Sequence, residues 1–141
     1  MSNFKLSKRS KSRRAGIDPR LIEIDDLAIQ LTTVDFGHPR DAGVRDSDRQ
    51  YEIFVSGNSM CDGTKRVSKH QSGKALDFYA FVDGSASWKH SHLAMVAVAY
   101  LQAASMLGYK LSWGGLWVRD DAIEIDGIKY GWDMSHVQLE E

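Results

Sequence analysis

The sequence predicts one α+β domain in which a small antiparallel sheet is flanked by helices. Two segments have helical periodicity, residues 18–32 and the strongly apolar run 93–107. Two others have the composition of strands, since 77–82 is rich in aromatic and β-branched residues and 123–130 alternates around an Asp-Gly turn. At 141 residues the chain is long enough for one hydrophobic core and too short for two.

The first fourteen residues form a basic arm. Its basic side chains all precede the first acid, Asp18, and they are Lys5, Lys8, Arg9, Lys11, Arg13 and Arg14. We expect residues 1–14 to be a mobile or loosely docked terminus and 15–141 to form the single folded domain, although attraction of the arm to an anionic polymer or phospholipid is an alternative. No apolar segment of the kind found in signal peptides follows the arm, so we expect synthesis in the cytoplasm without a secretion signal.

Composition excludes several classes of function. A formal net charge of -1 gives no global argument for binding to nucleic acid or membrane. The longest apolar stretch, 93–107, is interrupted by Gln102 and Ser105 and is too short to span a bilayer. The single cysteine, Cys61, excludes an intramolecular disulfide framework, and we interpret it as a loop thiol. We therefore expect no nucleic-acid partner and no integral membrane segment.

The first helix is predicted from its start. Asp18 followed by Pro19 is typical of an N-cap and first-turn pair, and apolar residues then recur at helical spacing. A short strand at 34–36 follows. In the turn-rich segment 37–42, His38 lies beside a proline, and we expect its side chain to be exposed.

A second helix is predicted over 47–57, capped by Asp46 or by the serine after it. The apolar helix 93–107 follows His90 and His92. A His-x-His pair can bind a metal ion, but at the start of a helix we expect these side chains to be exposed or to cap the helix.

The most informative stretch runs from His70 to Asp77. These two side chains are seven residues apart, and a loop that turns at Gly73 and re-enters as a strand can bring them to one point. A catalytic zinc ion takes three protein ligands from His, Asp or Glu and leaves a position for water. His136, near the end of the chain, is the candidate third ligand, and Asp133 just before it is well placed to act as a general base.

The pattern His70-x-x-Gly-x-Ala-x-Asp77, followed by Asp133-x-x-His136, resembles the zinc peptidases of the D-alanyl-D-alanine carboxypeptidase and dipeptidase group. Within that group it most resembles the small L-alanyl-D-glutamate endopeptidases that tailed bacteriophages use as endolysins. The resemblance covers nearly the whole chain. Further shared blocks are 43–45 with Gln50, 68–70, 113–117 and 136–139. It implies the fold of D-alanyl-D-alanine peptidases and hedgehog-like domains, with zinc on the sheet held by His70, Asp77 and His136.

The resemblance also implies roles for other side chains. Asp133 would accept a proton from the zinc-bound water, and Arg45, at the end of a Gly-x-Arg strand, would stabilise the oxyanion together with zinc. Without the family, Arg45 would be interpreted as a surface ion pair with Asp46 or Asp48. The candidates for substrate contacts are Gln50, Ser68 and Trp117.

The implied function is zinc-dependent cleavage of the L-alanyl-D-glutamate bond in peptidoglycan stem peptides, which lyses the host cell wall. Asp rather than Glu at the base position favours the phage endopeptidases. Alternatives are a D-alanyl-D-alanine carboxypeptidase or dipeptidase, and a non-catalytic zinc-containing wall-binding or virion protein. A nuclease using His90 and His92 ranks last, because the folded part lacks a basic face.

The same resemblance implies where such a protein works. It would be a monomer made in the host cytoplasm that reaches the wall, in the periplasm, after a holin-like partner has permeabilised the membrane.

Overall fold

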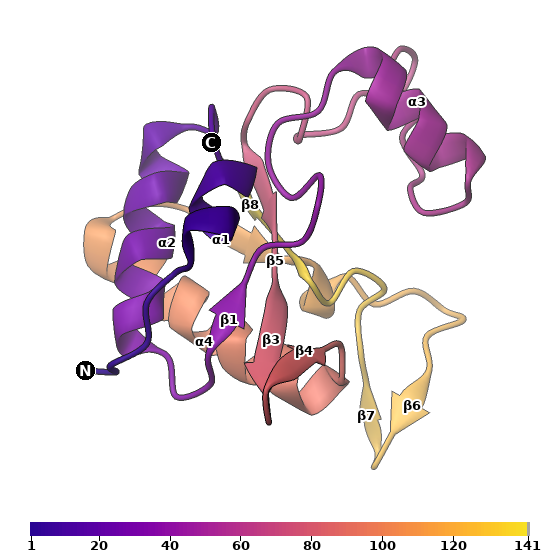
Figure 1. Cartoon of the computed structure of the whole chain (residues 1–141). Coiled ribbons are helices and arrows are strands. Elements are labelled where there is room, and N and C mark those ends of the chain that lie inside the picture. Colours follow the sequence, from indigo (N-terminus) through magenta and orange to yellow (C-terminus); the bar gives the residue numbers. More distant parts are fainter. Residues whose placement is uncertain (141) are drawn as a thin grey trace.

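The structure is a computed structural model that describes residues 1–140 (Figure 1). Its helices are α1 (Lys8–Arg13), α2 (Pro19–Leu31), α3 (Ser47–Val55), α4 (His90–Leu107) and the 3-10 helix η1 (Gly114–Leu116). Its strands are β1 (Phe36–Gly37), β2 (Ala75–Asp77), β3 (Tyr79–Val82), β4 (Ser85–Ser87), β5 (Leu111–Trp113), β6 (Glu124–Ile125), β7 (Ile128–Lys129) and β8 (His136–Leu139). The predicted α+β class is confirmed. Within the described part of the chain, no helix has both the length and the hydrophobicity needed to cross a membrane.

The strands pair into two small antiparallel sheets and a separate hairpin. One sheet has the order β1-β3-β4, the other has the order β2-β8-β5, and β6 pairs with β7. The strand predicted over 77–82 is divided at Phe78, because Asp77 pairs with His136 of β8 whereas Tyr79 pairs with Gly37 of β1. Phe78 itself is fully buried, and its N–H donates to the carbonyl of Ser135. The chain therefore passes from one sheet to the other directly after Asp77.

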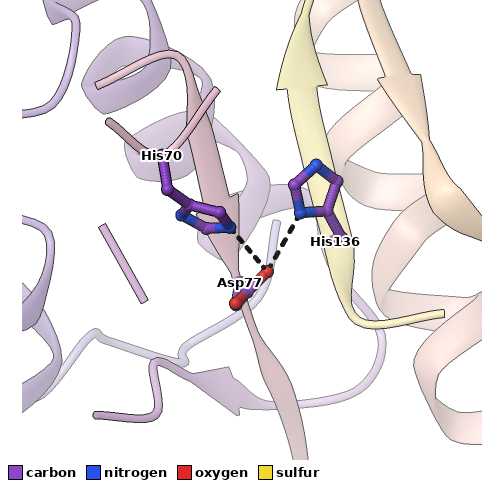
Figure 2. Close-up of side chains that lie close together, drawn as sticks. All are labelled: His70, Asp77 and His136. Atoms are coloured by element: carbon purple, nitrogen blue, oxygen red, sulfur yellow. Dashed lines mark hydrogen bonds and ion pairs between the residues drawn. The ribbon is translucent and has the colours of Figure 1, made fainter. Parts of the chain in front are cut away.

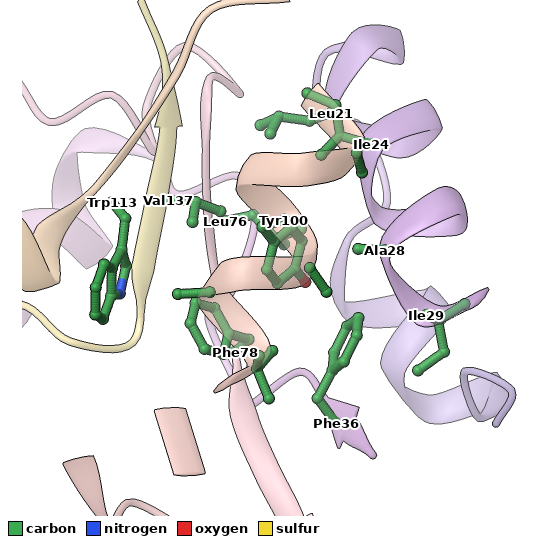
Figure 3. Close-up of a cluster of buried hydrophobic side chains, with 14 of the residues drawn as sticks. Leu21, Ile24, Ala28, Ile29, Phe36, Leu76, Phe78, Tyr100, Trp113 and Val137 are labelled. Carbon is green, nitrogen blue, oxygen red and sulfur yellow. The ribbon is translucent and has the colours of Figure 1, made fainter. Parts of the chain in front are cut away.

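The core lies between α2, α4 and the strands (Figure 3). Tyr100 of α4 stands at its centre, with its ring centroid 5.2 Å from that of Phe36 and 5.1 Å from that of Phe78. Leu21 and Ile24 of α2 are fully buried in the same cluster. Burying each large apolar side chain contributes about 1.5–3 kcal/mol, so this cluster fixes the strands that carry the candidate site.

The first fourteen residues are not loosely docked in the structure. Leu6 is 7% exposed and belongs to the core, and Ser7 caps α1 by accepting the N–H of Ser10. Arg14 is buried, and its Nη1 donates to Asp25 at 2.8 Å and to Asp26 at 2.7 Å. The expectation of a loose arm came from the charge run alone, which does not reveal carboxylate partners farther along the chain.

His38 is fully buried, and the expectation of an exposed loop histidine was wrong. It donates from Nε2 to Oδ2 of Asp25 at 2.9 Å and from Nδ1 to the carbonyl of Asp77 at 2.7 Å. Burial lowers the pKa of His38, but the charge of Asp25 and its hydrogen bond outweigh burial and raise the pKa above its ordinary value. Asp25 also accepts hydrogen bonds from Arg14 and Tyr100. This buried network connects α2 to the backbone of the strand that carries Asp77.

Candidate metal centre and active site

His70, Asp77 and His136 converge where β2 and β8 meet (Figure 2). Asp77 and His136 lie opposite each other in the β2–β8 register, and His70 comes from the loop before β2. Oδ1 of Asp77 lies 3.3 Å from Nε2 of His70 and 3.2 Å from Nδ1 of His136. One nitrogen or oxygen atom from each residue lies within 4.8 Å of the others, so the three could hold a metal ion.

Both histidines are oriented by carbonyl oxygens on the far side of the ring. Nδ1 of His70 is 2.9 Å from the carbonyl of Gly43, and Nε2 of His136 is 2.9 Å from Oε1 of Gln138. When both rings are neutral, as metal binding requires, an acceptor at each far nitrogen would keep the proton there and leave the lone pair of the nitrogen that faces Asp77 for the metal. The donor set therefore fits a metal ion. Sequence reasoning missed Gln138, although alternation along a strand places it on the same face as His136.

Arg45 binds the other oxygen of Asp77. Its Nη2 donates to Oδ2 of Asp77 at 2.8 Å, its Nε donates to the carbonyl of Asp41 at 2.9 Å, and its Nη1 contacts Oε1 of Gln50 at 3.3 Å. Arg45 therefore forms its ion pair with Asp77 inside the site, and not with Asp46 or Asp48 at the surface. Burial raises the pKa of Asp77, but His70 and the hydrogen bond from His136 outweigh burial and hold the pKa far below its usual range. Asp77 is therefore ionised, as a metal ligand must be.

Gln50 is fully buried behind Arg45. Its Nε2 donates to Oγ of Ser59 at 2.8 Å and to the carbonyl of Cys61 at 2.9 Å, so its amide connects Arg45 to the loop after α3. Gln50 does not line the cavity into which the site opens. Its contacts suit holding the guanidinium of Arg45 in place better than touching a substrate.

Asp133 lies beside the three converging residues without joining them. Its Oδ2 is 3.7 Å from Nδ1 of His136, and burial raises its pKa above the ordinary value. Two glycines allow the close backbone approach that places it there. A Cβ on Gly114 would lie 2.1 Å from the carbonyl oxygen of Asp133, and a Cβ on Gly131 would lie 2.2 Å from the carbonyl oxygen of Gly114. Only glycine fits at these positions, so the 114–115 turn fixes the position of Asp133.

The site opens into a cavity of about 650 Å³, which we call the central cleft. Its lining includes Arg45, Ser68, Lys69, His70, Asp77, Trp117, Arg119, Trp132, Asp133 and His136. Trp117 forms a wall, with its ring centroid 5.3 Å from that of His136. Ser68 also borders the cleft, but its Oγ accepts the N–H of His70 and so supports the loop. His90 and His92 lie outside this group, at the start of α4. Both are half-buried rather than exposed, and no side chain within residues 1–140 caps this helix, so that part of the expectation was wrong.

An α+β domain with two imidazoles and a carboxylate around one point, and a further carboxylate in the same cleft, has the features of a metal-dependent hydrolase. A family model described as phage L-alanyl-D-glutamate peptidase matches residues 1–140. The chain belongs to this family, as the resemblance predicted.

Two relatives show how far the similarity extends. The L-alanyl-D-glutamate peptidase of Escherichia phage T5 is 30% identical over 139 residues, which cover 97% of this chain and 98% of the relative. Among solved structures, the Serratia marcescens L-Ala D-Glu endopeptidase ChiX matches with a TM-score of 0.74 at 30% identity, covering 96% of this chain and 90% of that one. Both relatives are peptidases by name, and both are matched over nearly their full length.

Proposed function

We propose that this protein is a zinc-dependent endolysin that hydrolyses the L-alanyl-D-glutamate bond of peptidoglycan stem peptides. The observation that carries the proposal is the convergence of His70, Asp77 and His136 beside the carboxylate of Asp133. Two imidazoles and one carboxylate, with space left for water, are typical ligands of catalytic zinc. When bound, zinc would lower the pKa of a coordinated water and polarise the scissile carbonyl.

Asp133 is the proposed general base and acid. It would accept a proton from the attacking water as the new carbon–oxygen bond forms, and it would return that proton to the amine as the carbon–nitrogen bond breaks. Burial favours its neutral form, which assists the second transfer. Its place in the central cleft, outside the three candidate ligands, leaves its carboxylate available for this exchange.

Arg45 is the proposed stabiliser of the developing oxyanion. A guanidinium carries five N–H groups, and Arg45 uses one each for Asp41, Gln50 and Asp77. The N–H groups that remain can donate to a substrate oxygen, since Arg45 borders the central cleft. Its fixed position means that little reorganisation accompanies the reaction.

The charge of the cleft suits an anionic peptide. Arg45 and Lys69 contribute cationic groups to its lining. In the stem peptide, the D-glutamyl residue carries a free carboxylate next to the scissile amide, and the residues after it add further carboxylates. These cations would bind that side of the substrate, with Trp117 as a wall of the cleft.

We also propose the setting in which the enzyme works. It would act as a monomer on the wall, from the periplasm, after a holin-like partner has opened the membrane. Lysis of intact host cells by external enzyme, with and without prior membrane permeabilisation, tests this setting, and equal lysis under both conditions would contradict it.

The decisive experiment digests purified Gram-negative peptidoglycan with the wild type and with Asp133→Ala, while the zinc content of both proteins is measured. We expect zinc in both, solubilisation only by the wild type, and released fragments that mass spectrometry identifies by new L-alanyl and D-glutamyl ends. Release of free D-alanine would instead indicate a carboxypeptidase. Zinc in both proteins with no cleavage by either would indicate a wall-binding protein.

A further inference from the structure

A second cavity, of about 460 Å³, adjoins the central cleft. The two share Arg119, Trp132 and Asp133 as lining, so they meet at the proposed general base. We call the second one the aromatic cavity, because it is lined by Trp88, Tyr130 and Trp132. Tyr130 follows the β6–β7 hairpin, which projects from the body of the molecule in Figure 1, and Trp88 precedes α4. Nothing in the proposed chemistry uses this cavity.

Its walls present flat apolar surface to solvent. Trp88 is 51% exposed and Trp132 is 44% exposed, although large aromatic side chains are usually well buried. The guanidinium of Arg119 lies 5.4 Å from the ring centroid of Trp132, which holds a polar group at the edge of the aromatic surface. Exposed rings bordered by polar groups are typical of a binding site.

His90 adds a second indication of a ligand. Its ring packs on Tyr130 with centroids 5.0 Å apart, and its buried Nδ1 has no hydrogen-bond partner in the described part of the chain. Buried side-chain nitrogens are nearly always paired, because an unpaired one has lost its hydrogen bonds to water without gaining others. A ligand with hydroxyl or amide groups that enters the aromatic cavity could supply the partner once the ring turns toward it.

The chemistry of the proposed substrate identifies such a ligand. In peptidoglycan the L-alanyl residue is joined through a lactyl group to the ring of N-acetylmuramic acid, so a saccharide lies within one residue of the scissile carbonyl. The D-glutamyl residue and its carboxylates lie on the other side. The two cavities share Asp133 as lining and match these two sides of the substrate. Only the central cleft is lined by the cations Arg45 and Lys69, and only the aromatic cavity is lined by Trp88 and Tyr130.

We propose that the aromatic cavity binds the N-acetylmuramic acid ring of the glycan strand, an inference that rests on the proposed endopeptidase function. The apolar C–H face of a pyranose packs on an aromatic ring, and its hydroxyl and N-acetyl groups hydrogen-bond to polar side chains. His90 and Arg119 would be those side chains. The subsite would favour glycan-attached stem peptides over free peptides.

The test compares kcat/KM for two substrates that share the same stem tetrapeptide, one carrying the disaccharide and one without it. We expect the wild type to prefer the glycopeptide by about tenfold, the equivalent of 1.4 kcal/mol. Trp88→Ala should reduce this ratio to about two, because the largest exposed ring of the cavity is lost. Tyr130→Leu, at the other wall, should reduce the ratio in the same direction.

The matched control is Tyr51→Ala. Tyr51 is 55% exposed on α3 and, like Trp88, packs against another aromatic ring, but it lines neither cavity. It should leave the ratio at the wild-type value. Circular dichroism spectra of the variants exclude misfolding as the cause of any change.

Equal kcat/KM of the wild type for both substrates would overturn the saccharide subsite, and so would an equal loss on both substrates in Trp88→Ala. If the wild type cleaves neither substrate, the proposed function fails on its own. Calorimetric titration with the disaccharide peptide then decides the question of the subsite. Weaker binding by Trp88→Ala than by Tyr51→Ala would support the subsite, and equal affinity would refute it.

Discussion

Replacing Asp133 by asparagine separates proton transfer from metal binding. Asparagine keeps the shape that packs against Gly114 but cannot accept a proton. Oδ2 of Asp133 lies 3.7 Å from Nδ1 of His136, and the atoms of the three candidate ligands converge within 4.8 Å without it. Loss of a general base costs about 10²–10⁴ in rate, or roughly 2.7–5.4 kcal/mol of transition-state stabilisation. The zinc content should not change.

The assay follows new amino termini released from purified peptidoglycan, and atomic absorption measures zinc after dialysis. His136→Ala is the contrasting variant, because it removes a candidate ligand and should lose zinc together with activity. Burial raises the pKa of Asp133, so the acid limb of the wild-type pH profile should lie above 3.8 and should be absent from the residual activity of Asp133→Asn. Loss of zinc by Asp133→Asn, or a rate within tenfold of the wild type, would refute the assignment.

Three further changes test the surroundings of the site. Gly114→Ala would place a Cβ 2.1 Å from the carbonyl oxygen of Asp133, so kcat should fall while far-UV circular dichroism keeps its helical signal; unchanged kcat would contradict the close approach. Asp25→Asn breaks a fully buried ion-pair network, and urea unfolding should show a loss of about 3–5 kcal/mol, whereas a loss under 1 kcal/mol would mean that the pairing is dispensable. Because the folded pKa of His38 is raised above 6.5, its contribution to stability is complete below that pH and is lost as the pH rises through the folded value. The difference in unfolding free energy between the wild type and His38→Asn should therefore shrink as the pH rises above 6.5, and a difference that grows with pH would show the opposite shift.

The fold class and the closeness of His70 to Asp77 followed from local patterns, whereas the third candidate ligand was implied by the resemblance to the family. Spacing around a glycine turn placed His70 near Asp77, and the family motif supplied His136. In the structure, the antiparallel pairing of β2 with β8 sets Asp77 opposite His136. Asp77 ends β2 and His136 begins β8, so the pairing of the two strands brings the two side chains together. Local signals were sufficient for His70 and Asp77, because one motif contains both the turn and β2, but not for their pairing with His136 on β8.

Other features depended on partners far away in the sequence. His38 lies in a turn-rich segment, and only the fold brings it between Asp25 and the carbonyl of Asp77. The change of sheet at Phe78 also depends on distant strands. The composition of 77–82 suits one strand as well as two, and the chain divides there because β2 pairs with β8 whereas β3 pairs with β1. Residue type predicts an element well, but its partner is decided by long-range packing.

The position of β8 has a consequence for the order in which the enzyme is built. In the β2-β8-β5 sheet, β8 is the middle strand although its residues are the last of these to be synthesised. Neither β2 nor β5 has its neighbour in that sheet until residues 136–139 have left the ribosome, because both pair with β8. A chain translated only as far as β7 therefore lacks both this sheet and one candidate ligand, and hydrolytic competence can arise only after residues 136–139 have been added.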